Sequence, residues 1–315
     1  MVKNIANIPS KHKASVYILS FVAIVLWGLS YIWSNKLLGL GIPVEFFVFA
    51  RVLLAGFILL ILNLIMGKNL KIHKKDLPFF LLPSLFEPFI YFICETYGIR
   101  FTESPTYSAL IIASTPIASV VAGMLIFKEK FNILNMVGIL VCLGGIVMVT
   151  ICAESIGDMF MFGLLLLVIA VFAEVGHASC TKALTTREYE PQVIVMFQFL
   201  IGSLYLLPLF LTKGIRNFDP TTYMSWEVWK AILCLAVFCS SIAFSLWVGT
   251  IKNLGVAKSS IFLSMIPVVT AIAEWALGGH VLRPLQWVGI FISCLGVVVT
   301  QITCVRCKCG KSRTR

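Results

Sequence analysis

Residues 104–150 read SPTYSALIIASTPIASVVAGMLIFKEKFNILNMVGILVCLGGIVMVT, and a shift of 151 positions lays this stretch over residues 255–301 without a gap. Nine of the 47 aligned pairs are identical. Matches of Leu, Ile and Val carry little weight in an apolar sequence. The informative matches are a mid-span proline and two glycines: Pro116/Pro267, Gly138/Gly289 and Gly145/Gly296. Two membrane helix pairs of similar composition would also look alike, but the shared spacing favours an internal duplication.

The composition indicates a chain whose solvent is lipid. Hydrophobic residues make up 59% of the 315 positions, mean hydropathy is +0.98 and charged residues are only 12%. A soluble fold of this size could not cover so much apolar surface. The net charge of +11 lies between the apolar runs, without a basic patch interleaved with aromatics, so it predicts membrane orientation and no nucleic-acid partner.

The ten cysteines carry no disulfide pattern, because most stand singly inside apolar runs. Cys304, Cys307 and Cys309 have the spacing of a metal knuckle but lack a nearby histidine or fourth cysteine, which favours a free-thiol tail.

An apolar run of about 20 residues spans a bilayer as a helix. Ten such runs predict an all-α membrane protein: 15–37, 44–66, 77–98, 105–127, 133–153, 159–184, 191–212, 230–252, 257–278 and 284–304. The first run is too long for a signal peptide and has no small-x-small cleavage site. We therefore expect tails at 1–14 and 305–315, and two five-helix repeats at 15–153 and 159–304.

The loop charges predict that both termini are cytoplasmic. With the N-terminus inside, the inside segments hold 18 Lys and Arg and the outside segments hold six. Because five spans is an odd number, the second repeat enters the membrane inverted relative to the first. Inverted repeats are common in secondary transporters, which bind substrate near the midplane between the halves, although some channels share the arrangement.

The third span carries an acidic face. Glu87, Tyr91 and Glu95 recur every four residues, and Pro88 is predicted to kink this helix and free a backbone carbonyl. A charged side chain in a span costs about 2.5–3.5 kcal/mol and needs a partner or a wet cavity. We expect Glu87 on a central cavity, the alternative being a neutral or paired carboxyl. For Glu95, a cavity position and a position at the interface remain open.

Two further charged sites lie within spans. Arg51 is at a depth between Glu87 and Glu95, and we favour a structural ion pair over a substrate contact. Glu174 and His177 share a face of the sixth span with Thr181. The acid beside the imidazole favours a proton carrier, with a plain hydrogen-bonded pair as the alternative. Candidates for proton coupling are therefore Glu87, Glu95, Glu174 and His177.

Other polar residues mark the candidate cavity. Trp27 and Tyr31 share a face of the first span with polar groups, although aromatic stripes are more often packing residues. Thr115 and Ser264 stand beside the mid-span prolines Pro116 and Pro267, which loosen a helix and expose backbone acceptors. The fifth and tenth spans are smooth and marked by glycines, as in a scaffold or a homodimer contact.

The chain is similar to the drug/metabolite transporter superfamily, of the EamA type. The residues that carry the resemblance are FARVLLAG with Arg51, YFICETYGIRFT (91–102), and the stretch with Pro116, Glu129, Gly138 and Gly145. The second copy keeps Pro267, Gly289 and Gly296 but has His280 where the family usually has glutamate. The resemblance implies ten spans in a 5+5 inverted repeat, a cavity lined by spans one, three, four, six, eight and nine, and export of amino acids or related metabolites.

These observations predict a secondary transporter in the cell (inner) membrane, with lipid and a small-molecule substrate as partners. No phosphate-binding loop and no H-E-x-x-H pair occurs in the sequence, so we expect no catalytic residues, no cofactor and no metal. A structural or sensory membrane protein and, less favoured, an intramembrane enzyme remain as alternatives.

Overall fold

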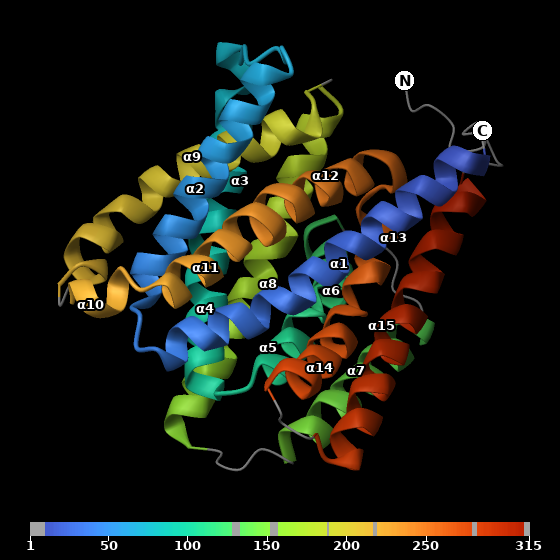
Figure 1. Cartoon of the computed structure of the whole chain (residues 1–315). Helices are drawn as coiled ribbons and strands as arrows, with labels where there is room; N and C mark the ends of the chain where they lie inside the picture. The colour runs from blue at the N-terminus through green and yellow to red at the C-terminus, as the bar shows by residue number, and fades with distance from the viewer. Residues whose placement is uncertain are drawn as a thin grey trace.

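The computed structural model describes residues 10–127, 133–151, 157–187, 189–216, 219–278 and 282–311, and side chains within most of these ranges. This part of the chain contains helices and turns and no strand, as the sequence predicts (Figure 1). Glu129 and His280 lie outside the described residues, as do the side chains of Cys304, Cys307 and Cys309.

The helices follow one another through short connections. In the first half they are α1 (Ser10–Gly39), α2 (Val44–Ile65), α3 (Leu77–Ser84), η3 (Leu85–Ile90), α4 (Tyr91–Thr102), α5 (Pro105–Ile112), α6 (Thr115–Phe127) and α7 (Ile133–Ile151), with a 3-10 turn, η2 (Lys74–Asp76), before α3. In the second half they are α8 (Asp158–Thr185), α9 (Pro191–Leu209), η4 (Phe210–Gly214), α10 (Pro220–Tyr223), α11 (Trp226–Cys234), η5 (Leu235–Ile242), α12 (Ala243–Leu254), α13 (Val256–Leu263), α14 (Ile266–Gly278) and α15 (Pro284–Lys311).

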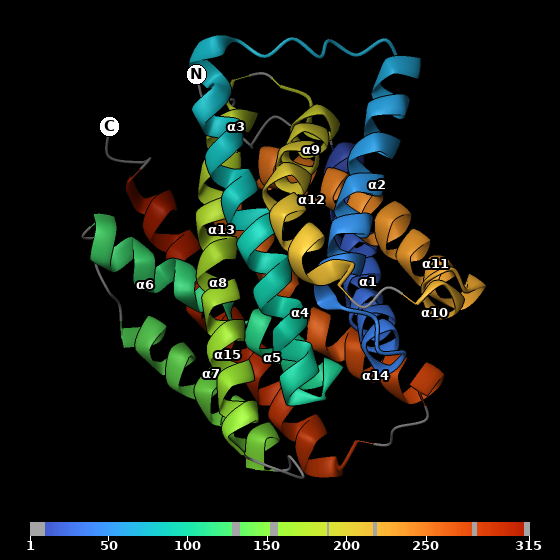
Figure 2. The same cartoon turned by 90° about the vertical axis from the view of Figure 1, so that its left-hand side faces the viewer.

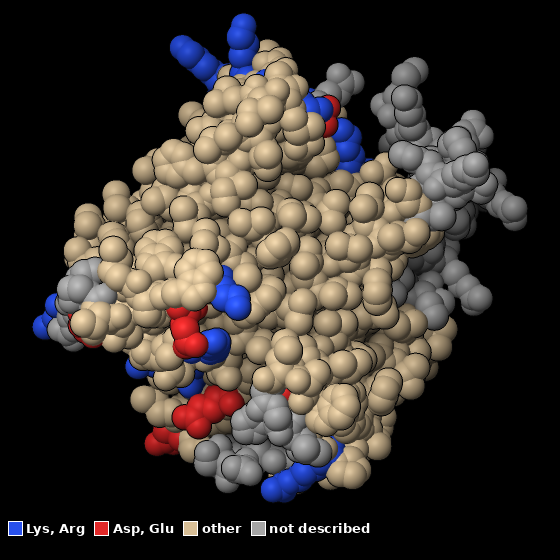
Figure 3. All heavy atoms as spheres, in the orientation of Figure 1, with Lys and Arg blue, Asp and Glu red and all other residues tan. Residues whose placement is uncertain are grey.

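Seven helical stretches among the described residues are long and apolar enough to cross a membrane. At the other three predicted spans the described residues form shorter apolar helices, within 105–121, 266–277 and 284–300. The spans predicted at 105–127 and 257–278 are each divided in two, into α5 and α6 and into α13 and α14. In Figure 3, charged side chains lie at the top of the molecule and over its lower half, and an uncharged band separates the two groups.

The two halves have their helix breaks at equivalent places. Turns at 113–114 and 264–265 separate α5 from α6 and α13 from α14, directly before Pro116 and Pro267. Both prolines therefore stand in the first turn of a new helix, where the missing N–H costs nothing, and do not kink a continuous one. The predicted third and eighth spans are each irregular: residues 85–90 contain a break at Glu87, and residues 235–242 are π-helical. In Figure 1, α1 runs away from the end that holds Ser10, whereas α8 runs towards it.

The glycines of the fifth and tenth spans are used within the chain. Helices α7 and α15 pack along each other, and Figure 2 shows them side by side. A Cβ on Gly145 would stand 2.5 Å from the Gly289 carbonyl oxygen, and one on Gly296 would stand 2.3 Å from the Cys142 nitrogen. Small residues permit this close approach. The glycines of α7 and α15 are covered by this contact within the chain, so they are not evidence for a homodimer.

Replacing Gly145 by leucine is expected to destabilise the protein by about 1–3 kcal/mol, because the new side chain would overlap the α15 backbone. Gly144→Leu is the matched control, since a Cβ at Gly144 meets nothing within 4 Å. Thermal unfolding of both variants in detergent measures the difference. Equal melting temperatures would show that the α7–α15 contact does not form as described.

The end of the bundle that holds Ser10 is tied together by a small polar cluster. The loop 66–76, which crosses this end from α2 to α3 in Figure 2, brings Asp76 to the loop between α8 and α9. Tyr189 Oη donates to Asp76 Oδ2 over 2.8 Å, and Arg187 Nη1 lies 3.5 Å from Asp76 Oδ1. Arg187 also covers the Phe79 ring at 3.5 Å. Desolvation and the Asp76 hydrogen bond raise the pKa of Tyr189, which keeps its hydroxyl a donor. The cluster joins the first half of the chain to the second.

Candidate functional site

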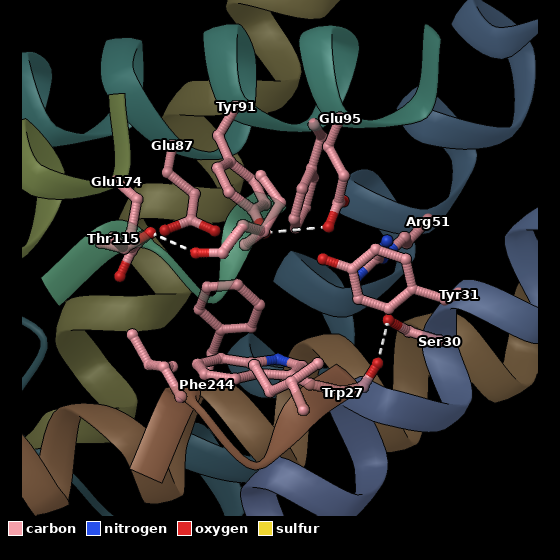
Figure 4. A pocket seen from close by; sticks show the side chains of 14 residues that line it. Trp27, Ser30, Tyr31, Arg51, Glu87, Tyr91, Glu95, Thr115, Glu174 and Phe244 are labelled. Carbon is pink, nitrogen blue, oxygen red and sulfur yellow. Dashed lines mark hydrogen bonds between the residues drawn. The ribbon is translucent and has the colours of Figure 1, made fainter. Parts of the chain in front are cut away.

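A pocket lies between the two halves. The first half contributes most of its polar lining and the second half contributes Glu174, Phe244, Leu263 and Ile266. Figure 4 shows these side chains converging from helices that are far apart in the sequence.

A break in the third span turns Glu87 into this pocket. The backbone of Glu87 is extended (φ −143°, ψ 124°), and the Glu87–Pro88 peptide bond is cis. Helix α9 approaches the break at Gly202, where a Cβ would stand 2.3 Å from Pro88 Cγ. The predicted effect of Pro88 is therefore present, and the interruption is a full break with an extended residue between two helices.

Glu87 meets His177 and Glu174 across the boundary between the halves. His177 Nδ1 lies 2.8 Å from Glu87 Oε2 and 3.6 Å from Glu174 Oε2. All three side chains are buried. His177 Nε2 faces Gln198 Oε1 at 3.4 Å, and Gln198 Nε2 donates to Thr181 Oγ1 over 2.8 Å. A polar path therefore leads from the pocket through His177 into the second half.

The same three residues are the only described group of three that offers a cluster of metal-ligand atoms, all within 4.8 Å of one another. The short Glu87–His177 contact already supplies the imidazole with an acid partner. Charge pairing between these groups accounts for their proximity without an ion, and we assign no metal here.

Arg51 lies at the opposite end of the pocket from Glu87 and Glu174 (Figure 4). Its side chain is buried, with Nε donating to Ser240 Oγ over 2.7 Å and Cζ lying 4.2 Å from the centroid of the Phe92 ring. No described carboxylate lies within 4.0 Å of its nitrogens. The prediction of a structural ion pair is therefore wrong for the described residues. Ser240 and Phe92 hold the guanidinium beside the cavity, more than 4.0 Å from the Glu95 carboxylate.

Tyr31, Tyr91 and Glu95 surround Arg51 at this end. Tyr91 Oη donates to Glu95 Oε1 over 2.9 Å, as their spacing of four residues on one helix face permits. The Tyr31 hydroxyl is buried and faces the Glu95 carboxylate and the Tyr91 hydroxyl. Glu95 is buried as well and lines the pocket.

Three aromatic rings form an apolar wall of the pocket: Trp27, Phe92 and Phe244. Trp27 packs edge-on against Phe244 with ring centroids 4.9 Å apart, and its Nε1 donates to the Cys239 carbonyl over 3.1 Å. Sequence reasoning missed Phe92, Phe244 and the Arg51 partner Ser240. With 24 phenylalanines in the chain, nothing in the sequence marks these two.

The remaining predicted cavity residues have separate positions. Thr115 lines the pocket and donates to the Ile112 carbonyl over 2.6 Å, next to the break before Pro116. Ser264 stands at the equivalent break in the second half, but it is not among the residues that line the pocket, and its carbonyl accepts from Cys294. His177 lies behind Glu87, one layer away from the cavity.

Comparison with known proteins agrees with this architecture. An uncharacterized transporter of Bacillus subtilis, YetK, is 28% identical over 96% of this chain and 91% of its own length. An uncharacterized transporter of Archaeoglobus fulgidus is 24% identical over 82% of this chain and 88% of its own length. A crystal structure that is 14% identical in sequence superposes with a TM-score of 0.68 over 92% of this chain and 99% of that one, which shows a shared fold.

The family comparison covers nearly the whole chain. The model of the EamA-like transporter family matches twice, at residues 14–151 and again at residues 161–302. These matches confirm the resemblance seen in the sequence and indicate a multi-pass membrane transporter. The chain belongs to the EamA-like transporter family.

Proposed function

We propose that the protein is a secondary transporter that moves a small zwitterionic or amphipathic metabolite, such as an amino acid, by alternating access. The proposal includes ten spans in two inverted five-helix repeats, with the termini cytoplasmic and export as the direction that the family resemblance implies. One observation carries it: the pocket with buried charges lies between the halves and takes charged side chains from both, Arg51 and Glu87 from one and Glu174 from the other. Such a site at the interface of two repeats is the arrangement that alternating access needs.

The pocket chemistry supports a polar substrate of modest size. Acids stand at both ends of the cavity, a cation stands at one, and aromatic rings cover the wall between them. Burying charges within a bilayer is costly, so a bundle with only a scaffolding role would gain nothing from unpaired charges around an internal space.

Proton coupling is part of the proposal. The Glu87–His177 contact joins a residue of the first half to one of the second, and it borders the pocket. A proton taken up by this pair changes the charge that holds the halves together at the site where substrate binds. Substrate and proton would then bias the same rearrangement, as coupling requires.

The polar cluster at the Ser10 end is proposed as the cytoplasmic gate. Asp76→Asn weakens the contacts to Arg187 and Tyr189, and charge-assisted hydrogen bonds contribute about 1.5–3 kcal/mol. We expect amide exchange in segments 73–80 and 186–192 to accelerate about tenfold or more. Asp219→Asn is the control, because Asp219 is exposed and, among the described residues, its carboxylate accepts hydrogen bonds from its neighbours Thr221 and Thr222 alone. Unchanged exchange in Asp76→Asn would mean that the cluster does not close this end.

Ligand-induced stabilisation tests the function itself. The melting temperature of the detergent-purified protein would be measured against amino acids, amines, nucleosides and sugar phosphates at two pH values. A compound that binds the folded state stabilises it by about 2.7 kcal/mol at 100 times its Kd. We expect one chemically coherent group of zwitterions to raise the melting temperature, and a smaller rise in Arg51→Gln, because Arg51 lines the pocket. No shift with any compound would contradict the transporter proposal.

A further inference from the structure

His177 is surrounded by groups that accept hydrogen bonds. Its Nδ1 lies 2.8 Å from Glu87 Oε2 and 3.6 Å from Glu174 Oε2, and its Nε2 faces Gln198 Oε1 at 3.4 Å. The side chain is buried in the bundle. A neutral imidazole carries a proton on one ring nitrogen and a lone pair on the other. Whichever nitrogen lost its proton would therefore turn a lone pair towards an acceptor, which is unfavourable in a buried site.

Thr181 fixes the orientation of the Gln198 amide. Thr181 stands one helical turn after His177 on α8, so both side chains reach the same amide on α9. Gln198 Nε2 donates to Thr181 Oγ1 over 2.8 Å, which directs the amide oxygen at the imidazole. An amide oxygen accepts hydrogen bonds and cannot donate one. In this orientation, Gln198 stabilises a proton on His177 Nε2.

Two acids compete for the Nδ1 side of the ring. The ligand atoms of Glu87, Glu174 and His177 all lie within 4.8 Å of one another, and Figure 4 shows the two carboxyl groups side by side at one end of the pocket. The short Glu87 contact lacks the alignment of a hydrogen bond, so the attraction between opposite charges holds it. If Glu87 instead carried the proton and Nδ1 were bare, the lone pair would face the second acid, Glu174. The contacts therefore favour a ring that is protonated on both nitrogens.

The two acids together can hold one proton more. One imidazolium neutralises one carboxylate, and the second carboxylate lies close enough to the first to repel it. Two carboxyl groups in this arrangement share a proton, because both cannot be charged at low cost. Glu87 and Glu174 also line the pocket, whereas His177 lies behind them. The shared proton therefore has access to the cavity.

We propose that Gln198 is a positioning residue that keeps both ring nitrogens of His177 protonated and so makes His177 a fixed cation. The coupling proton is then bound and released by the carboxyl groups of Glu87 and Glu174. This inference rests on the proposed proton coupling and names the groups that carry the proton. A proton from the pocket adds to a carboxylate of this pair to form a carboxylic acid, and it returns to the pocket by the reverse step. Substrate and proton thus reach their sites through the same cavity.

Other titratable groups that act on this cluster, among the described residues, are Tyr91 and Glu95 on α4 and Cys180 on α8. A tyrosine and a thiol are uncharged in their ordinary state, so neither adds a charge beside His177. Glu95 lies at the Arg51 end of the pocket, where the guanidinium offsets its charge. The charge of the imidazole is therefore set by its three direct partners.

Nuclear magnetic resonance tests the state of the imidazole. The chain has four histidines, and replacing His12, His73 and His280 by asparagine leaves His177 as the single isotope-labelled ring in the full-length protein in lipid. Nitrogen chemical shifts distinguish a protonated ring nitrogen from a bare one. We expect both nitrogens to stay protonated from about pH 5 to pH 8, the range in which an ordinary histidine loses its charge. A bare Nδ1 or Nε2 anywhere in this range would overturn the proposal.

Variants of Gln198 test its positioning role in the same spectra. Gln198→Leu removes the acceptor that faces Nε2, so we expect loss of the Nε2 proton within that pH range. Gln198→Glu keeps an acceptor there and should keep both protons. Thr181→Val removes the hydroxyl that orients the amide and should lose the proton in part. Gln192→Leu, six positions earlier on α9, is the control and should match the wild type. If Gln198→Leu and Thr181→Val both keep the two protons, Gln198 does not position His177.

Infrared difference spectroscopy tests the acids. A protonated carboxyl group absorbs apart from a carboxylate, so a pH titration follows the shared proton. We expect a band that titrates in the wild type and is lost in both Glu87→Gln and Glu174→Gln, because a single acid is already neutralised by the imidazolium. Glu227→Gln, at an exposed glutamate, is the control and should keep the band. A band that persists in both pocket variants would assign the proton to another group.

Both spectra are recorded without substrate, which separates this inference from the proposed function. If the spectra are as expected and no substrate is transported, the proposed function fails and the protonation of the cluster stands. If substrate is transported and His177 titrates, the fixed cation fails and the proposed function stands.

Discussion

Replacing Glu87 by glutamine is expected to abolish proton-driven accumulation of substrate while preserving exchange of substrate across the membrane. The variant keeps the shape of the side chain but cannot gain or lose a proton next to His177. Without that change of charge, the pair no longer links the proton gradient to the rearrangement of the halves. Substrate exchange needs only the substrate-bound carrier to change its orientation, so we expect the variant to retain it. We expect accumulation to fall at least about 100-fold, the size of a coupling free energy near 3 kcal/mol.

Accumulation and exchange would be measured side by side in proteoliposomes, with radiolabelled L-leucine or L-phenylalanine and an imposed pH gradient. Glu227→Gln is the matched control, since its side chain is 64% exposed and its contact with Lys36 is a weak one at 3.9 Å. Full accumulation by Glu87→Gln would remove Glu87 from the coupling mechanism. Loss of exchange together with accumulation would place Glu87 in substrate binding.

Replacing His177 by leucine is expected to destabilise the protein by about 3–5 kcal/mol, the second large effect. The imidazole is the only described basic group within 4.0 Å of the buried Glu87 carboxyl group, and its loss leaves that carboxyl group without its partner. Adding Glu87→Gln to the same variant should restore part of the lost stability, because the unpaired charge is then gone. The coupling free energy between the two positions follows from the four melting curves.

His73→Leu is the control for this cycle. His73 is exposed, and the contact it makes to Tyr189 uses its backbone nitrogen, so the substitution should change stability little. A double variant that is no more stable than His177→Leu would show that Glu87 and His177 are not coupled, and would leave the cavity at His177 as the source of the loss.

The sequence predicted the parts of the site that depend on local spacing. Tyr91 and Glu95 were expected on one helix face, and the pocket receives both. Glu87 lines the pocket as well, but from the break before Pro88 and not by helical spacing. Pro116 and Pro267 predicted equivalent irregularities in two spans, and both spans are broken directly before them. The spacing of side chains on a helix and the position of proline in a first turn both act over about one helical turn. They can therefore be recognised without knowledge of the fold.

The parts that depend on contacts between distant residues were not predictable. His177 was placed beside Glu174 by spacing, but its shorter contact is to Glu87, which is 90 positions away. Arg51 was expected to find an acid at its own depth, and depth alone does not say which neighbours hold a side chain. Its position is fixed by Ser240 and Phe92, and Ser240 belongs to the other half of the chain.

The glycines show the same limit in another form. Gly138, Gly145, Gly289 and Gly296 correctly predicted a close helix contact, because small residues allow one. Their spacing does not distinguish a contact within the chain from one between two chains. The structure places the partner helix in the same chain, which the sequence left open.

Counterflow in proteoliposomes tests the central claim most directly. Vesicles that contain the wild-type protein and a high concentration of unlabelled L-phenylalanine or L-leucine are diluted into a trace of the same labelled amino acid, with no ion gradient. A carrier that alternates around one site must exchange, so the account predicts a transient accumulation of label above its equilibrium level, absent in vesicles without protein and lost in Arg51→Gln. Label that rises only to equilibrium, or does not enter at all, would contradict the claim that the pocket between the halves carries these amino acids across the membrane.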